Sequence, residues 1–128
     1  MGYRSDVAYK IRFEKAEDFW AFIAEAKLDP ETQLCFTEEF VDNFKVDEQH
    51  HDISFLAEGW KWYDEYDEVQ CHQALWAKAR DRCDEDNVEV DGAYCRIGEE
   101  SDDIDERYFG NDPWDMVRVS RSIQVDWM

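Results

Sequence analysis

Basic residues are scarce in this chain of 128 residues, which has 14 Lys and Arg against 33 Asp and Glu and a formal net charge of −19. Proteins that bind nucleic acid by counterion release place Lys and Arg on the phosphates, and anionic membranes repel a surplus of carboxylates. We therefore expect no direct binding to nucleic acid or to membranes. The expected partner is a basic protein surface, and such surfaces are most common on proteins that themselves handle nucleic acid.

Glycine and proline are also rare, with five and two residues, and no repeat or low-complexity linker divides the chain. This length is typical of one domain, so we expect a single domain over residues 1–128. No apolar run is long enough to span a membrane, and the opening MGYRSDVAYK lacks the apolar segment of a secretion signal. The expected location is the cytoplasm, with the cysteines reduced.

The short motifs of common catalytic sites are missing from the sequence. It contains no H-E-x-x-H, no P-loop, no G-x-S-x-G and no G-x-G-x-x-G. Cys35, Cys71, Cys83 and Cys95 form no C-x-x-C pair, and the spacing around His72 is not that of a zinc site. We therefore expect no enzymatic activity, no cofactor and no metal site.

Aromatic residues are plentiful, with six Trp, six Tyr and eight Phe. They can supply a hydrophobic core and still leave large side chains for a binding surface, so the chain is not a disordered acidic tail. The charge is unevenly spread, because residues 31–106 hold 24 acids and six bases, a net of −18. The two outer segments, 1–30 and 107–128, are close to neutral.

Hydrophobic periodicity predicts the secondary structure. Alternating apolar residues indicate strands over residues 5–13, at Phe44 and Val46, over residues 53–62 with a bulge at Gly59, and at Ala93, Cys95 and Ile97. Helical spacing indicates helices over residues 14–30 and 66–83. A final strand or strand pair is predicted from Val117, Val119, Ile123 and Val125. In the second helix Trp76 and His72 share the apolar face, so we expect Trp76 to be buried and His72 to lie at the edge of the core.

This order is β-α-β-β-α-β with an additional C-terminal strand, the ferredoxin-like or split βαβ pattern of an α+β fold. We expect an antiparallel sheet covered by two helices on one face. The other face is partly open, and it is a candidate surface for a homodimer.

The most acidic segment is residues 81–106, with 12 acids and two bases. Its second half, GEESDDIDER, fails as a calcium loop, since counting from Asp103 places Tyr108 where glycine is required. A solvated turn is one interpretation. Another is a surface of fixed carboxylates that imitates nucleic-acid phosphates, and adaptation to high salt is a third explanation for the charge. The candidate partner-binding acids are Asp84, Glu85, Asp86, Glu99, Glu100, Asp102, Asp103, Asp105 and Glu106.

The stretch WKWYDEYDE, residues 60–68, alternates four aromatic residues with four acids. Aromatic side chains act as rigid anchors at binding surfaces, which makes Trp60, Trp62 and Tyr63 candidates for partner binding. An acidic and aromatic corner could also stack against a sugar. The alternative is that the two Trp rings close the junction between sheet and helix.

Four segments, MGYRSDV, KWYDEYDEVQ, RIGEESDDID and VSRSI, resemble a group of small acidic proteins encoded by tailed phages and prophages. That group has no assigned activity, so the resemblance implies phage origin and a bacterial host cell but no functional residue. Several small acidic phage proteins inhibit host defence, as anti-CRISPR and anti-restriction proteins do.

The function predicted from these observations is that of a non-enzymatic, phage-encoded interaction protein. It would bind and inhibit a basic host protein that handles nucleic acid, with its acids acting as a DNA mimic. The alternatives are a small-ligand binder or enzyme that uses residues 60–68, and a phage accessory or structural domain without an inhibitory role.

Overall fold

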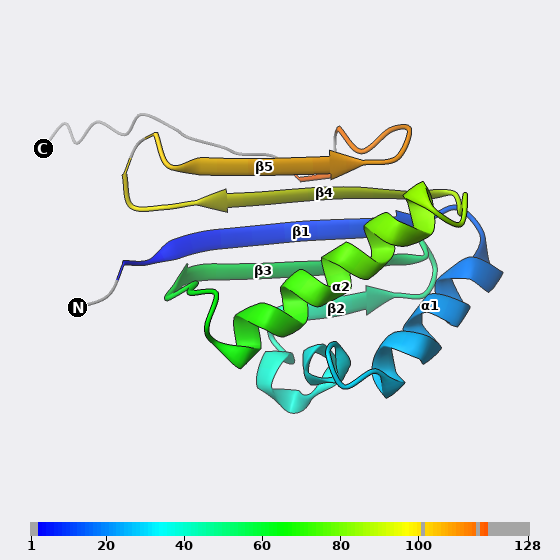
Figure 1. Ribbon diagram of the computed structural model, residues 1–128, viewed down its shortest axis with the longest axis horizontal. Helices are drawn as coiled ribbons and strands as arrows, with labels where there is room; N and C mark the ends of the chain where they lie inside the picture. Colours follow the sequence, from blue (N-terminus) through cyan, green and yellow to red (C-terminus); the bar gives the residue numbers. More distant parts are fainter. Residues whose placement is uncertain (1–2, 101, 115, 118–128) are drawn as a thin grey trace, which may run out of the picture.

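The computed structural model describes residues 3–100, 102–114 and 116–117, which form an α+β fold (Figure 1). The strands are β1 (Ser5–Phe13), β2 (Phe44–Asp47), β3 (Asp52–Trp60), β4 (Val90–Ile97) and β5 (Ile104–Phe109). The helices are α1 (Ala16–Leu28) and α2 (Asp67–Asp84), and two short 3-10 helices, η1 (Gln33–Phe36) and η2 (Glu38–Phe40), lie between α1 and β2. Neither described α-helix combines the length and apolar character that a membrane crossing requires.

The five strands form one antiparallel sheet in the order β2-β3-β1-β4-β5. Because β1 and β2 both run antiparallel to β3, they are parallel to each other with β3 between them. By the same argument β3 and β4 are parallel, with β1 between them. Each helix therefore connects two parallel strands that are separated by a third strand.

The alternation predicted for β1 decides which face of the sheet is buried. Its odd-numbered residues from Val7 to Phe13 are almost completely buried, and they contact rings from both helices. Phe13 packs against Phe19 of α1 at 6.2 Å between ring centroids, and Tyr9 packs against Trp76 of α2 at 6.5 Å. Both helices thus cover the same face, and Trp76, at 5% exposed, is buried as predicted.

The bulge predicted at Gly59 is confirmed. Gly59 has a φ of +68°, a conformation that costs glycine little, and the β1–β3 register shifts between Ser5 and Val7. After this bulge Trp60 is half-buried and Trp62 is buried. The bulge thereby directs the chain from β3 into the corner that precedes α2.

The acidic segment 98–107 is not only a turn, because β5 begins within it. Ile104 pairs with Ile97, and Glu106 pairs with Cys95. Backbone pairing to β4 forms this strand, although its side chains alternate little in hydrophobicity. The strand predicted at the C-terminus is not tested as a whole. Val117 lies in a bend after β5, and Val119, Ile123 and Val125 lie outside the described residues.

The opposite face of the sheet carries no described helix. Leu56, Ile104 and Tyr108 are exposed there, and the Tyr108 ring lies 5.0 Å from that of Trp114. This is the face through which the sequence predicts a homodimer, and that association stays a prediction.

Candidate interaction surface

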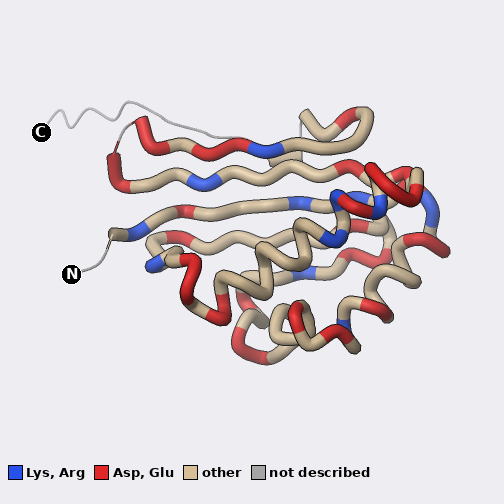
Figure 2. Tube along the Cα trace, viewed as in Figure 1, with Lys and Arg blue, Asp and Glu red and all other residues tan. Residues whose placement is uncertain are grey.

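The two halves of the acidic segment lie at opposite ends of the sheet (Figure 2). Asp84 is the last residue of α2, and Glu85 and Asp86 follow it directly. The acids from Glu99 to Glu106 lie between β4 and β5 and at the start of β5. The eight residues of β4 separate them, and at about 3.3 Å per residue this strand spans roughly 23 Å. The acids of residues 81–106 therefore form two surfaces rather than one.

Asp103 holds the turn between β4 and β5 together. Its carboxylate accepts two hydrogen bonds from the Arg96 guanidinium, at 2.8 and 3.2 Å. It also accepts one from the Tyr3 hydroxyl at 2.6 Å. Arg96 and then Tyr3 hold the pKa of Asp103 at about 2, below its usual range, because both stabilise the charged form. Asp103 is thus an ion-paired carboxylate that orders the turn.

Gly98 allows these groups to meet. Its N–H donates to the Asp103 carbonyl at 2.8 Å, which closes the turn. A Cβ at this position would overlap both the Asp103 carboxylate and the Tyr3 hydroxyl. The absence of a side chain at Gly98 therefore permits the close approach of residue 3 to the turn.

The N-terminal residues link this turn to the aromatic corner at residues 60–68. The Tyr3 N–H donates to the Tyr63 hydroxyl at 2.7 Å, and the Arg4 N–H donates to the Glu99 carboxylate at 2.8 Å. The Arg4 guanidinium also donates to the Gly59 carbonyl at 2.8 Å. Residues 60–68 and the β4–β5 turn, which are distant in sequence, are therefore joined through residues 3–4 into one surface. We call this surface the acidic end; its described residues are 3–4, 60–68, 98–100 and 102–106.

The acids of the acidic end differ in how far they are free to contact a partner. Glu100 and Asp102 are exposed, and in the part of the chain that the structure describes their side chains form no hydrogen bond or ion pair. Glu106 is also exposed, with the Tyr108 hydroxyl 3.5 Å from its carboxylate. Asp105 is half-buried and pairs with Arg107 at 2.9 Å.

Among the aromatic candidates, Trp62 serves the core. It is 8% exposed, and its ring packs against Phe55 at 5.9 Å and His72 at 6.2 Å. Trp60 and Tyr63 are half-buried, and Trp60 stacks on Phe40 at 6.0 Å. Each of these two rings thus presents only part of its surface to a partner.

Beside this corner lies a hollow of about 440 Å³. It is lined by Trp62, Tyr63, Asp64, Glu65, Gln73, Tyr94, Arg96, Asp105 and Arg107. The Arg107 guanidinium lies 5.3 Å from the centre of the Tyr94 ring and pairs with Asp105. Charged groups that already pair with one another therefore occupy much of its wall.

The second acidic surface, at the end of α2, is organised differently. Arg82 forms ion pairs with Glu25 and, at 3.3 Å, with Asp86. Asp84 and Glu85 are exposed and form no hydrogen bond or ion pair through their side chains within the described residues. The helix dipole disfavours carboxylates at the C-terminal end of a helix. Arg82 is the basic residue that pairs with the described acids at this end.

His72 lies inside the core, so the prediction that it lies at the edge of the core is wrong. The side chain is 1% exposed, because the aromatic rings around it, including Phe40 and Phe55, enclose it. Its Nδ1 lies 2.5 Å from the Tyr9 hydroxyl. Burial lowers its pKa to about 3, so the ring is neutral at physiological pH.

Sequence patterns did not predict the residues that connect the β4–β5 turn to the corner at residues 60–68. Tyr3 and Arg4 lie in a segment with no motif, and Arg96 is a single base in an acidic region. The pairing of Arg96 with Asp103 depends on the β4–β5 hairpin, and β5 was not predicted. No spacing rule relates residue 3 to residue 103.

Comparisons of the chain with protein-family models, with curated proteins and with solved structures give no match. The resemblance to acidic phage proteins therefore stays a prediction.

Proposed function

We propose that this chain is a non-enzymatic interaction protein that binds a basic, nucleic-acid-handling protein through its acidic end. The observation that supports this most directly is that Tyr3 and Arg4 join the β4–β5 turn and the corner at residues 60–68. Exposed carboxylates and partly exposed aromatic rings lie together there in one ordered surface. Such a surface combines electrostatic steering with rigid anchors.

Ordered carboxylates suit the imitation of phosphates better than a mobile acidic tail does. Arg96, Asp103 and Tyr3 fix the turn that carries Glu100 and Asp102, so these two charges need little further ordering on binding. In this proposal the partner is a host protein inhibited by a phage-encoded DNA mimic inside a bacterial cell, as the four resembling segments suggest.

The ferredoxin-like assignment belongs to the same proposal, supported by two helices that each connect parallel strands across an intervening strand, with β5 added beside β4.

Two matched variants test which acidic surface binds. Glu100→Gln with Asp102→Asn changes the acidic end, and Asp84→Asn with Glu85→Gln changes the α2 end by the same two charges. The wild type and both variants are immobilised and exposed to nuclease-treated bacterial lysate. We expect the wild type and the α2-end variant to retain the same basic nucleic-acid-binding proteins, and the acidic-end variant to lose them.

Competition with added DNA completes this test. Proteins held through their nucleic-acid groove should be displaced by DNA, because both ligands occupy the same basic surface. Equal recovery by all three baits, or recovery that DNA does not reduce, would contradict the proposal.

The hollow beside residues 60–68 gives less support to a small-ligand binder or an enzyme. The guanidinium of Arg107 lies over Tyr94, Trp62 is buried, and Tyr63 packs edge-on against Tyr66 at 5.3 Å. The stacking surface that a sugar requires is thus largely occupied. An accessory role without inhibition is the outcome that the capture experiment would support if no basic protein is retained.

A further inference from the structure

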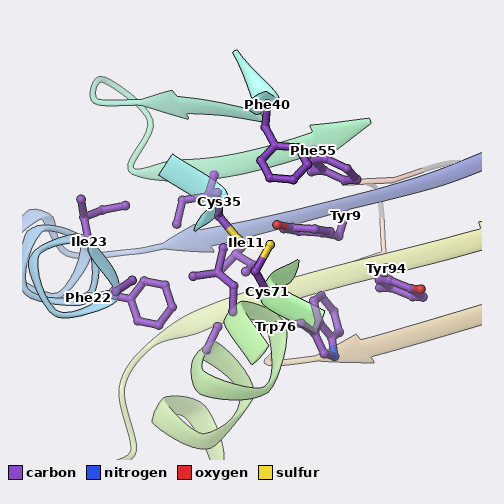
Figure 3. Close-up of a cluster of buried hydrophobic side chains, with 14 of the residues drawn as sticks. Tyr9, Ile11, Phe22, Ile23, Cys35, Phe40, Phe55, Cys71, Trp76 and Tyr94 are labelled. Atoms are coloured by element: carbon purple, nitrogen blue, oxygen red, sulfur yellow. The ribbon is translucent and has the colours of Figure 1, made fainter. Parts of the chain in front are cut away.

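Two thiols and an imidazole meet in the core, although Cys35 is distant in sequence from Cys71 and His72. Cys35 comes from η1, and Cys71 and His72 come from the first half of α2. Their nearest sulfur and nitrogen atoms all lie within 4.8 Å of one another, and all three side chains are buried. Figure 3 shows the sulfur atoms of Cys35 and Cys71 directed toward one another beside the Tyr9 hydroxyl.

The arrangement is close to that of a tetrahedral zinc site. With Zn–S bonds of about 2.3 Å and Zn–N bonds of about 2.05 Å, neighbouring sulfur and nitrogen ligands are about 3.5 Å apart, and two sulfur ligands about 3.8 Å apart. The Cys35 Sγ to His72 Nδ1 distance is already 3.5 Å. Closing the remaining separations, which are at most 4.8 Å, shortens the sulfur–sulfur distance by about 1.0 Å or less and the sulfur–nitrogen distance by about 1.3 Å or less on this comparison.

The position of His72 also favours a ligand at this site. Its ring centroid lies 4.6 Å from that of Phe40 and 4.0 Å from that of Phe55. These rings fix the imidazole with Nδ1 toward the sulfur of Cys35. On the other side of the ring, Nε2 has no hydrogen-bond partner among the described residues. Nδ1 already accepts a hydrogen bond from Tyr9, so a metal ion would replace that bond, and the Nε2 proton keeps the same environment in both states.

A route from the surface reaches Cys71. A groove of about 540 Å³ is lined by Pro30, Glu31, Leu34, Asp67, Gln70, Cys71 and Ala74. Two of these residues, Glu31 and Asp67, are exposed carboxylates, which attract a cation to the entrance. Cys71 therefore belongs both to the wall of this groove and to the buried cluster.

We propose that Cys35, Cys71 and His72 bind one Zn²⁺ ion, with Cys35 Sγ, Cys71 Sγ and His72 Nδ1 as protein ligands. Both thiols lose their protons to solvent as the metal–sulfur bonds form, and the two thiolates neutralise the ion, so the buried site carries no net charge. The Tyr9 hydroxyl is released from Nδ1 and stays within reach of the thiolates, where it can donate a hydrogen bond that orients them. Water or the Tyr9 oxygen completes the fourth position.

Cobalt(II) is the probe, because tetrahedral thiolate coordination gives it intense charge-transfer and visible bands. The reduced, metal-free chain is titrated with Co²⁺ and then with Zn²⁺. We expect thiolate-to-cobalt bands that saturate at one equivalent and disappear as Zn²⁺ replaces the cobalt. Cys35→Ala and Cys71→Ala should lose these bands, and Cys83→Ala, which changes a thiol outside the cluster, should keep them.

A second measurement uses the wild type alone, because removal of a core cysteine could unfold the chain. Alkylation followed by peptide mass spectrometry reports the reactivity of each thiol with and without Zn²⁺. We expect Zn²⁺ to slow the modification of Cys35 and Cys71 at least 10-fold and to leave Cys83 unchanged. The absence of a thiolate band in the folded wild type, or equal protection of all cysteines, overturns the proposal, as does persistence of the band in Cys71→Ala.

Discussion

The core beneath α2 and the acidic end are held together by different kinds of contact. Beneath α2, Trp76 contacts the rings of Tyr9, Tyr94 and Phe109, with the Phe109 ring at 4.8 Å. At the acidic end, Asp103 is held by Arg96 and Tyr3 through partly buried hydrogen bonds. The first region is stabilised by the burial of apolar side chains, and the second by hydrogen bonds and an ion pair.

This difference suggests which residues can change without loss of the fold. Burial of a large aromatic side chain contributes several kcal/mol, whereas exposed ion pairs contribute little. The acidic end can therefore vary its charges at small cost in stability while the sheet and α2 keep it in place. A surface selected for binding a partner benefits from that separation.

The largest effect on stability is expected in the core. Trp76→Ala should lower the free energy of unfolding by about 3–5 kcal/mol, because it removes a large ring from a packed site. The measurement is urea denaturation followed by far-UV circular dichroism. Trp20→Ala is the control, since Trp20 is 44% exposed, and it should change the free energy by about 0.5 kcal/mol or less. Equal effects of the two changes would show that α2 does not bury Trp76.

A moderate effect is expected from Gly98→Ala at the acidic end. The added methyl group overlaps the ends of the Asp103 and Tyr3 side chains, so these must move aside, and each hydrogen bond lost costs about 0.5–1.5 kcal/mol. Hydrogen exchange should show faster exchange at residues 98–104, with the amides of β1 and β3 unchanged. Uniformly faster exchange across the sheet would mean that the acidic end and the core beneath α2 do not unfold independently.

A smaller, pH-dependent effect is expected from Asp103→Asn. Because the pKa of Asp103 is lowered to about 2 in the folded chain, its pairing stabilises the fold above the ordinary aspartate pKa of about 3.9. That contribution is lost as the pH falls through about 2. The variant should melt below the wild type at pH 6, and the difference should shrink steadily between pH 4 and pH 2. A difference that does not change with pH would show that Asp103 acts through packing instead of charge.

A still smaller effect, of opposite sign, is expected from Glu100→Gln with Asp102→Asn. Neutralising two unpaired carboxylates relieves repulsion between like charges, so the melting temperature should stay the same or rise slightly. Added salt should stabilise the wild type more than this variant, because salt screens the same repulsion over about 10 Å at 0.1 M. A marked loss of stability would mean that these acids have a structural role.

No effect is expected from calcium. The run at residues 98–107 lacks the spacing of a calcium loop, and its Asp103 carboxylate is already bound by Arg96. Thermal melts with and without millimolar Ca²⁺ at constant ionic strength should therefore coincide. A large upward shift would identify a cation site at the acidic end.

The sequence predicted the elements whose side chains alternate or repeat clearly. β1 and α2 were recognisable because Val7, Tyr9 and Ile11 face one side of a strand and Val69, His72 and Trp76 one side of a helix. β5 was missed because Phe109 is its one buried side chain, so its pairing with β4 leaves almost no hydrophobic pattern.

The candidate site could be predicted only in part. Its acids and aromatic residues were named from local composition, and the structure brings residues 60–68 and 99–106 together while placing residues 84–86 elsewhere. The contacts that decide this arrangement join Tyr3 to Asp103 and to Tyr63. They depend on how separate elements pack, and single-sequence patterns describe only local structure.

The acids of β5 have a further consequence for how the protein behaves at high concentration. Among the described strands β5 forms one edge of the sheet, and the exposed backbone of an edge strand is a template for pairing with another molecule. Glu106 points to one face of this strand and the Asp105–Arg107 ion pair to the other, so an approaching strand meets charged side chains on either side. The same carboxylates that suit a basic partner would thus keep copies of the chain from joining edge to edge into fibrils.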